Sequence, residues 1–432
     1  MELASALTVL LAICLVLITV KRKMSSHGRL PPGPTPLPVI GNFLQIKAAE
    51  TCKSLIKLSE KYGPVFTVYF GNRPVVILCG HDAVKEALVD KAEEFSGRKT
   101  MPTWDRNFQG YGVVFANGER WKQLRRFSLT VLRNFGMGKK TIEQRIQEEA
   151  QFLLEEFRKT NEKPFDNTYF LSRAVSNVIC SIVFGNRFDY QDKEFQALME
   201  MINNTFREMS TAWAQEKNNP DSEFNVKNLE LTTLTLFFAG TETVTSTLRY
   251  GFLFLMKYPE VQAKMHEEIV RVIGQNRAPN IEDRNQMPYT DAVIHEVQRV
   301  SDLIPMNLPH MVTRDTEFRG YLIPKGTEVY PVLTTVLNDS TKFKNPRQFS
   351  PEHFLDADGS FKKNDAFVPF SSGKRICLGE AMARMELFLF FTTVLQSFRL
   401  KPLMPPEDID TTPLESGFAN IVPTYQMCMV PR

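Results

Sequence analysis

Apolar residues recur every three or four positions along most of this chain, which is the spacing of one face of an α-helix. The same periodicity or a long apolar run marks four further stretches, so most of the chain is expected to be helical. The most regular positions are Ile142, Ile146, Ala150, Leu153 and Phe157, and the further expected helices are residues 50–62, 82–91, 229–256 and 380–395.

Residues that favour β-structure cluster mainly in two short stretches. Residues 65–70 and 75–78 lie on either side of Gly71 and Asn72, a pair typical of tight turns, and so predict a hairpin. No internal repeat, low-complexity tract or second domain boundary is visible beyond the N-terminal region. We therefore expect one large domain, residues 48–432, with a mainly α-helical fold and a minor β part.

Two segments precede this domain. Residues 3–20 are apolar or small and uncharged, and at the rise of a helix they would span roughly 27 Å, close to the thickness of a bilayer's hydrocarbon core. A cleaved signal peptide is the alternative, but the acidic Glu2 before the run and the basic residues after it favour an uncleaved anchor, residues 1–23, with the following chain in the cytosol. Residues 24–47 then form a proline-rich hinge.

Charge and cysteine content narrow the functional classes. The 432 residues carry a formal net charge of only +3, which is too small to indicate a surface that binds nucleic acid. The six cysteines are scattered, without a C-x-x-C pair or the spacing of a disulfide framework. This suits a reducing compartment.

One cysteine lies in an unusual setting, the segment Phe370-Ser-Ser-Gly-Lys-Arg-Ile-Cys-Leu-Gly379, directly before an expected helix. Its glycines allow the backbone to approach a flat, bulky partner closely. Backbone N–H groups at a helix start can stabilise a thiolate and lower its pKa, and Arg375 suits a carboxylate on the same partner. Taken alone, Cys377 would be interpreted as a small buried core residue, as most lone cysteines are.

The full pattern Phe-x-x-Gly-x-Arg-x-Cys-x-Gly resembles the haem-binding loop of the cytochromes P-450. By this resemblance, Cys377 is the axial thiolate ligand of the iron of haem b. Phe370, Gly373, Arg375 and Gly379 are then residues that bind the cofactor. A thiolate in this position donates electron density to the iron.

A second motif, Ala239-Gly-Thr-Glu-Thr243, lies inside the apolar run and resembles the oxygen-activation segment of the same family. Glycine within a helix lowers its stability by about 1 kcal/mol relative to alanine, so the presence of Gly240 calls for a structural or functional explanation. The resemblance implies a widened helix, with Thr243 as hydrogen-bond donor to dioxygen and Glu242 as proton source. The alternative is an ordinary buried helix in which Thr243 bonds back to its own backbone.

Trp121 and Arg125 lie one helical turn apart and carry only hydrogen-bond donors, which suits a carboxylate partner. Similar residues in the family hold the haem propionates. The resemblance adds Arg98, His310 and Arg375 to this set. For Arg98 or Arg125 taken singly, a solvated surface charge is the alternative.

Glu296 and Arg299 are also one turn apart, among apolar neighbours. Most such pairs are exposed and contribute little to stability. The family joins this Glu-x-x-Arg to a Pro-Glu-Arg-Phe segment, which here reads Pro351-Glu-His-Phe354, so His353 stands where arginine is usual. We expect a structural role for these residues, with a histidine charge that depends on pH.

The resemblance is closest to the microsomal second family, whose members metabolise drugs and odorants. It implies a monooxygenase of the endoplasmic reticulum membrane that inserts one oxygen atom of dioxygen into small apolar substrates of xenobiotic, fatty acid or steroid type. Electrons come from NADPH through NADPH-cytochrome reductase, with cytochrome b(5) as an additional donor. The implied substrate pocket is lined by Phe108, Phe115, Phe238, Ala239, Ile304, Met306, Leu308 and Phe418.

The chain departs from the family by an internal shortening between Gln215 and Glu216. The helices expected there, which form the roof of the pocket, are missing, as an omitted in-frame coding segment would produce. A catalytically impaired or non-functional haem-binding variant is therefore the alternative, because an open site admits water to reactive intermediates. A thiol hydrolase that uses Cys377 with a histidine is a third interpretation and requires the two side chains to meet.

Overall fold

The computed structural model describes residues 30–47, 50–99, 108–134, 140–183, 185–197, 199–200 and 226–432. The expected anchor and the shortened junction lie outside these residues. The chain forms two compact units. The smaller unit contains residues up to 99 together with 306–335, the larger unit contains residues 100–305 together with 336–432, and each has its own hydrophobic core.

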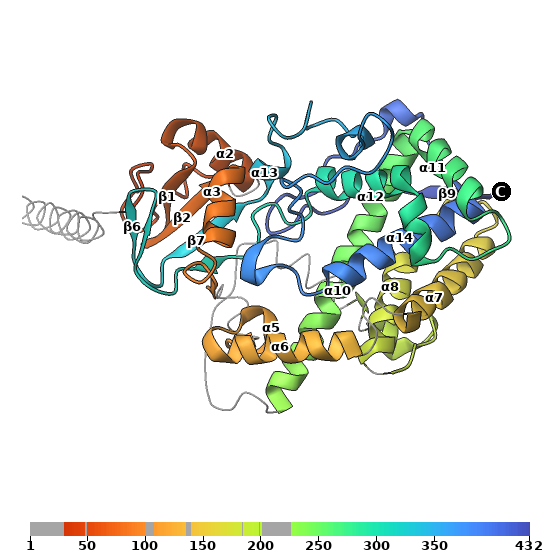
Figure 1. Cartoon of the computed structure of the whole chain (residues 1–432), viewed down its shortest axis with the longest axis horizontal. Coiled ribbons are helices and arrows are strands. Elements are labelled where there is room, and N and C mark those ends of the chain that lie inside the picture. Colours follow the sequence, from red (N-terminus) through yellow and green to blue (C-terminus); the bar gives the residue numbers. More distant parts are fainter. Residues whose placement is uncertain are drawn as a thin grey trace, which may run out of the picture. The chain divides into compact units, whose positions relative to one another are not determined.

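The smaller unit is built on a five-stranded sheet with strand order β1-β2-β7-β4-β3 (Figure 1). β1 and β2 form the expected hairpin, with Phe70 opposite Arg73 across the turn, and β7 runs parallel to β2. Alternate hairpin residues, among them Phe66 and Ile77, face one apolar core with Leu55. The elements are α2 (Thr51–Tyr62), β1 (Val65–Phe70), β2 (Arg73–Cys79), α3 (His81–Lys85), the π-helix η1 (Glu86–Asp90), β3 (Gly97–Arg98), β4 (His310–Met311), β5 (Thr316–Phe318), β6 (Tyr321–Ile323) and β7 (Glu328–Val332).

The larger unit is mainly helical. Its helices of a full turn or more are α5 (Gly112–Phe115), α6 (Gly118–Asn134), α7 (Lys140–Lys159), α8 (Thr168–Val183), α10 (Val226–Lys257), α11 (Pro259–Val272), α12 (Pro288–Ser301) and α14 (Glu380–Ser397). Short 3-10 helices lie at η2 (Ile281–Gln286), η3 (Pro351–Phe354), η4 (Gly373–Arg375) and η5 (Pro406–Asp408), and β8 (Phe398–Pro402) pairs antiparallel with β9 (Met427–Pro431). The short helix α13 (Thr334–Leu337) begins in the smaller unit and ends in the larger one.

The core of the larger unit forms around α10 and α14, which contact each other and, between them, α7, α8, α11 and α12 (Figure 1). The residues from Met385 to Leu395 are buried on every side of α14. A Cβ atom added at Gly251 of α10 would lie only 2.1 Å from the Phe391 ring of α14, so these two helices approach closely because position 251 lacks a side chain. This packing fixes the helix that follows the candidate haem loop.

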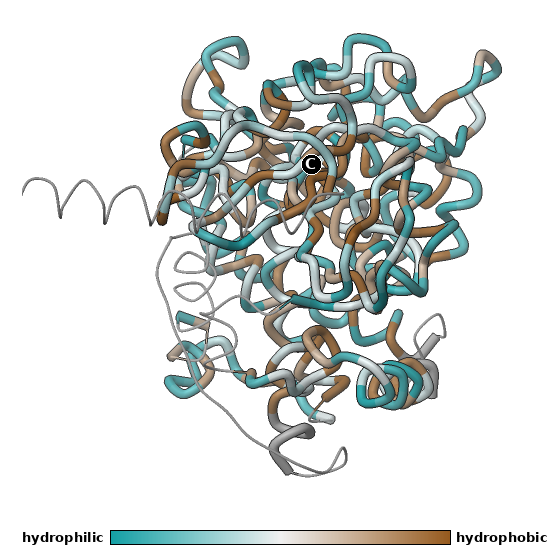
Figure 2. The backbone as a smooth tube through the Cα atoms, turned by 90° about the vertical axis from the view of Figure 1, so that its left-hand side faces the viewer, coloured by the Kyte–Doolittle hydropathy of each residue, from teal (hydrophilic) through white to brown (hydrophobic). Residues whose placement is uncertain are grey.

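The expected mainly α-helical fold with a minor β part is confirmed. The five periodic positions of α7, from Ile142 to Phe157, are all buried in one core. The helix expected at residues 82–91 is α3 followed directly by the π-helix η1. Figure 2 shows apolar stretches that alternate with hydrophilic ones, and no helix among the described residues combines the length and apolar character needed to cross a membrane.

Candidate active site

The loop that carries Cys377 is fixed by its own backbone. The N–H group of Cys377 donates to the carbonyl oxygen of Phe370 at 3.0 Å, and the chain turns at Ser371 and Gly373, which have φ values of 63° and 71°. Glycine adopts this left-handed conformation without strain. Cys377 is exposed, whereas Cys52, Cys79, Cys180 and Cys428 are buried. Among the described cysteines it is therefore the one with a solvent-accessible side that a bulky partner can reach.

The electrostatic setting of Cys377 differs in part from the expectation. Although part of its surface is open, protein surrounds the thiol on its other sides, and this burial raises its pKa. Three groups act to lower the pKa of the thiol, as expected, but burial outweighs them. They are the backbone N–H groups of Gly379 and Glu380 and the charge of Arg125. A metal cation bonded to the sulfur reverses such a preference, because a coordinating thiol is deprotonated.

Arg375 and Trp121 lie together in the larger unit. The buried guanidinium of Arg375 lies over the indole ring at 3.9 Å and donates from Nη2 to the carbonyl oxygen of Ala116 at 2.8 Å. A second, longer bond runs from its Nη1 to the carbonyl oxygen of Val114 at 3.4 Å. Arg375 thus joins the candidate haem loop to the end of α5.

Arg125 lies beside the same loop and donates from Nη2 to the carbonyl oxygen of Ile376 at 2.8 Å. Burial lowers the pKa of its guanidinium, and the opposing effect of the neighbouring Cys377 sulfur is smaller. Among the described residues no carboxylate forms an ion pair with Arg125. A partly buried cation without an acidic partner, next to an exposed thiol, fits an anionic cofactor that bonds through a metal.

Arg98 and His310 lie together in the smaller unit, directly opposite each other on β3 and β4. Both side chains are buried. Arg98 donates from Nη1 to the carbonyl oxygen of Leu308 at 3.0 Å, and Nδ1 of His310 donates to the carbonyl oxygen of Phe95 at 2.6 Å. The five expected propionate donors therefore form two groups, one in each unit.

The oxygen-activation motif lies in the middle of α10, with Glu242 buried. The helix is a continuous α-helix here, so the expected widening is wrong for this structure. The Oγ1 hydroxyl of Thr243 donates to the carbonyl oxygen of Ala239 at 2.7 Å. A Cβ atom at Gly240 would lie 2.7 Å from Cδ1 of Ile179, so the close packing of α8 accounts for this glycine.

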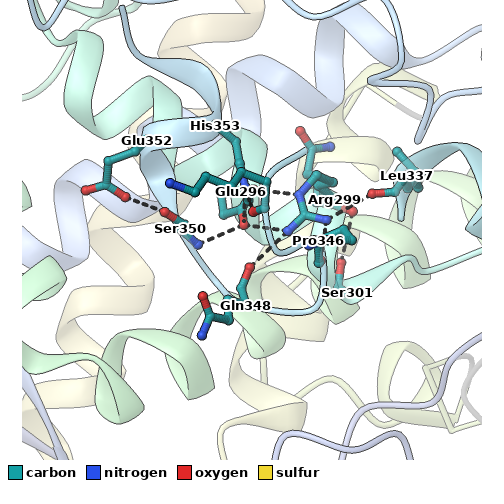
Figure 3. Close-up of polar contacts among 11 residues, drawn as sticks. Glu296, Arg299, Ser301, Leu337, Pro346, Gln348, Ser350, Glu352 and His353 are labelled. Carbon is teal, nitrogen blue, oxygen red and sulfur yellow. Dashed lines mark hydrogen bonds and ion pairs between the residues drawn. The ribbon is translucent and has the colours of Figure 1, made fainter. Parts of the chain in front are cut away.

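The structure brings Glu296, Arg299 and His353 together (Figure 3). Both side chains of the Glu296–Arg299 pair are fully buried, and two bonds of 2.7 Å join the carboxylate to Nε and Nη2 of the guanidinium. Arg299 also donates to the carbonyl oxygens of Leu337, Pro346 and Gln348. His353 contacts the same carboxylate at 3.1 Å. The network ties α12 to the segment before the candidate haem loop.

The expected pocket residues fall into three groups. Phe108 and Phe115 form a ring pair with centroids 5.1 Å apart at α5, which contacts α10. In α10 itself, Phe238 packs partly against the core and Ala239 is exposed. Ile304 and Phe418 are half-buried in the larger unit, whereas Met306 packs against the core of the smaller unit and Leu308 lies in the same unit.

Sequence reasoning missed Asn420 and Glu386. Asn420 bonds the end of α12, more than a hundred residues earlier in the chain, and no local pattern signals this contact. Glu386 is fully buried in α14, and its apolar surroundings in the sequence were the only available signal.

With this geometry in hand, comparison with known proteins defines the class. The family model described as Cytochrome P450 matches residues 31–215 and 212–429, and the chain belongs to this family. It is an oxidoreductase, a monooxygenase that uses haem with a cysteine thiolate ligand and electrons derived from NADPH. The family match is divided into two segments that overlap at residues 212–215, beside the junction that the sequence predicted.

Its relatives include cytochrome P450 2G1 of Oryctolagus cuniculus, 58% identical over 495 aligned positions that cover the whole of both chains. Cytochrome P450 2G1 of Rattus norvegicus is 57% identical over 97% of each chain, and cytochrome P450 2A13 of Homo sapiens is 54% identical over 99% of each. The alignment with the Oryctolagus cuniculus relative is longer than the 432 residues of this chain, so that relative has residues that this chain lacks.

Proposed function

We propose that Cys377 binds haem iron and that the enzyme oxidises small apolar substrates of xenobiotic, fatty acid or steroid type. The observation that supports this most directly is the exposed Cys377 thiol on a loop closed by a backbone bond to Phe370. When bound, haem supplies the chemistry by which one atom of dioxygen enters the substrate and the other leaves as water, with two electrons and two protons consumed.

The chain's own residues bind and orient the cofactor. Arg375, Trp121 and Arg125 of the larger unit would donate hydrogen bonds to its carboxylates. The guanidinium groups of Arg375 and Arg125 are already held by the carbonyl oxygens of Ala116 and Ile376, so little conformational freedom is lost on binding.

Proton delivery falls to α10. The buried Glu242 would act as the proton source, and the Thr243 hydroxyl, which here donates to the carbonyl oxygen of Ala239, would turn to donate a hydrogen bond to dioxygen. Phe108, Phe115, Phe238 and Phe418 exclude water from the substrate.

The electron donors that we propose are NADPH-cytochrome reductase and cytochrome b(5), at the endoplasmic reticulum membrane. Residues 1–23 serve as the anchor in this proposal and residues 24–47 as the hinge. The support is the uncharged run of residues 3–20, followed by basic residues.

A catalytically impaired haem-binding variant is the second candidate. The division of the family match into two segments supports it, as does the exposure of the apolar residues Leu234 and Ala239 on α10 among the described residues. Water that reaches the site then diverts electrons to peroxide. A thiol hydrolase is disfavoured, because among the described residues no histidine hydrogen-bonds to Cys377.

One spectrum separates these functions. The full chain, expressed in membranes, is reduced and exposed to carbon monoxide, and the Soret band is compared between wild type, Cys377→Ser and the buried-cysteine control Cys428→Ser. A strongly red-shifted band that only Cys377→Ser abolishes supports haem–thiolate binding. Substrate-dependent product then identifies an active monooxygenase, whereas NADPH consumption with peroxide alone identifies the impaired variant. An unchanged band in Cys377→Ser would overturn the assignment of the ligand.

A further inference from the structure

The C-terminal end of α12 is capped by a residue far away in sequence. α12 ends at Ser301, and Asp302 adopts a left-handed conformation with φ of 43°. The last carbonyl groups of a helix have no partner within it. Here, Nδ2 of Asn420 donates to the carbonyl oxygens of Asp302 at 2.8 Å and Ser301 at 3.3 Å.

Asn420 also holds the chain immediately beyond the helix. Its backbone N–H donates to the carbonyl oxygen of Leu303 at 3.0 Å, directly before Ile304. Its side chain is only 8% exposed, so these bonds are shielded from competing water. Three consecutive carbonyl groups thus depend on one residue.

The same asparagine closes the loop that carries Phe418. Its Oδ1 accepts a bond from Oγ of Ser416 at 2.8 Å, and residues 416 and 420 form an isolated bridge across the loop. Bonds of 2.9 Å from the N–H groups of Leu414 and Ile421 close the base of the loop. Phe418 therefore lies at the tip of a small hairpin whose closing residue is Asn420.

A third element adds to this contact. The hydroxyl of Tyr250, on α10, lies 3.4 Å from the carbonyl oxygen of Asn420 and 3.3 Å from that of Ile421. Asn420 thus joins α10, the end of α12 and the Phe418 loop, and all three belong to the larger unit.

We propose that Asn420 is a positioning residue that sets the distance between Phe418 and Ile304 and so determines how a substrate is oriented. The inference rests on the proposed function, because both residues line the pocket that it requires. A carboxamide is suited to the task because it donates two bonds and accepts others at once. An aspartate of the same shape presents only acceptors when ionised, so it repels the carbonyl oxygens of Ser301 and Asp302.

Binding of phenylimidazole to the holoenzyme tests the proposal, because an azole nitrogen shifts the haem spectrum while the phenyl ring occupies the pocket. Asn420→Asp is expected to weaken this binding by about 3- to 10-fold, the range of a lost hydrogen bond, with an unchanged carbon monoxide band. In a Phe418→Ala background the same substitution is expected to have no further effect. Full additivity of the two losses would overturn the proposal.

Hydrogen exchange provides a measurement that needs no haem. In Asn420→Asp, the amides of residues 414–421 are expected to exchange at least about tenfold faster, whereas Asn364→Asp leaves them unchanged. Asn364 is a matched control because its side-chain amide, like that of Asn420, both donates and accepts. It donates to the carbonyl oxygen of Lys342 and accepts from the N–H group of Ala366. Unchanged exchange in Asn420→Asp contradicts the proposal. A missing thiolate band in wild type contradicts only the proposed function.

Discussion

Nδ1 of His353 lies 3.1 Å from Oε1 of Glu296, and the other ring nitrogen of the histidine, Nε2, lies 2.6 Å from the carbonyl oxygen of Lys344. Both neighbours are acceptors, so both ring nitrogens must donate and the ring is an imidazolium. Burial alone lowers the pKa of His353, but the hydrogen bond and charge of Glu296 outweigh it and raise the pKa above the ordinary value. Histidine thus replaces the family's arginine only while protonated.

The stability of the protein should therefore depend on pH through His353. Since the folded-state pKa is raised, the stabilisation is fully present below the unfolded pKa, about 6.5, and is lost as pH rises through the folded pKa. His353→Arg should remove this loss, worth about 1–3 kcal/mol for charged hydrogen bonds. Urea unfolding between pH 5.5 and 9 measures it, and parallel pH curves for the two proteins would contradict the prediction.

Glu386 predicts a second pH effect, through a group that should be neutral. Its carboxyl is fully buried in α14, neither oxygen has a hydrogen-bond partner within the described part of the chain, and burial raises its pKa well above the usual range. Because the unfolded chain releases this proton near pH 4.3, stability falls by about 1.4 kcal/mol per pH unit from there up to the folded pKa.

Glu386→Gln should abolish this fall, so that the variant becomes increasingly more stable than wild type as pH rises. Chemical denaturation at several pH values compares both with Glu407→Gln, an exposed control on η5. If the free energies of unfolding of Glu386→Gln and wild type differed by the same amount at pH 5 and pH 8, the buried carboxyl would be ionised and the prediction would be wrong.

Arg299→Lys should destabilise the larger unit by at least about 3 kcal/mol. The guanidinium binds one carboxylate and three carbonyl oxygens in complete burial, and an ammonium group cannot reproduce this planar fork. Thermal unfolding measures the loss. Arg271→Lys, on an exposed side chain with a 3.5 Å contact to Glu268, is the control and should change little.

Gly251→Ala should destabilise by about 1–3 kcal/mol, because the added methyl group clashes with the Phe391 ring between α10 and α14. Adding Phe391→Leu should recover part of the loss by making room. If the loss of stability in the double variant equalled the sum of the losses in the two single variants, the clash would be relieved elsewhere and the prediction would be wrong.

The sequence predicted local periodicity well and long-range contacts poorly. The buried face of α7, from Ile142 to Phe157, and the hairpin at Gly71 could be predicted because both are encoded by the pattern of residues close together in the sequence. The family resemblance gives Gly240 a role at the oxygen site, whereas its close contact with Ile179 of α8 has no signal in the local sequence. Asn420 escaped notice because its partners are determined by tertiary packing alone. Motifs indicate chemistry, whereas the reasons for single small or polar residues often lie in a distant helix.

The enclosure of α14 also bears on how the protein is made. This helix packs against α7, α10, α11 and α12, all of which precede it in the chain, and it follows the Cys377 loop directly. These helices therefore leave the ribosome before the helix against which they pack, and α14 follows only when nearly the whole chain has been synthesised. The Cys377 loop is synthesised together with α14, so prosthetic-group capture becomes a late step of biogenesis, and chaperones have a long interval in which to hold the nascent enzyme.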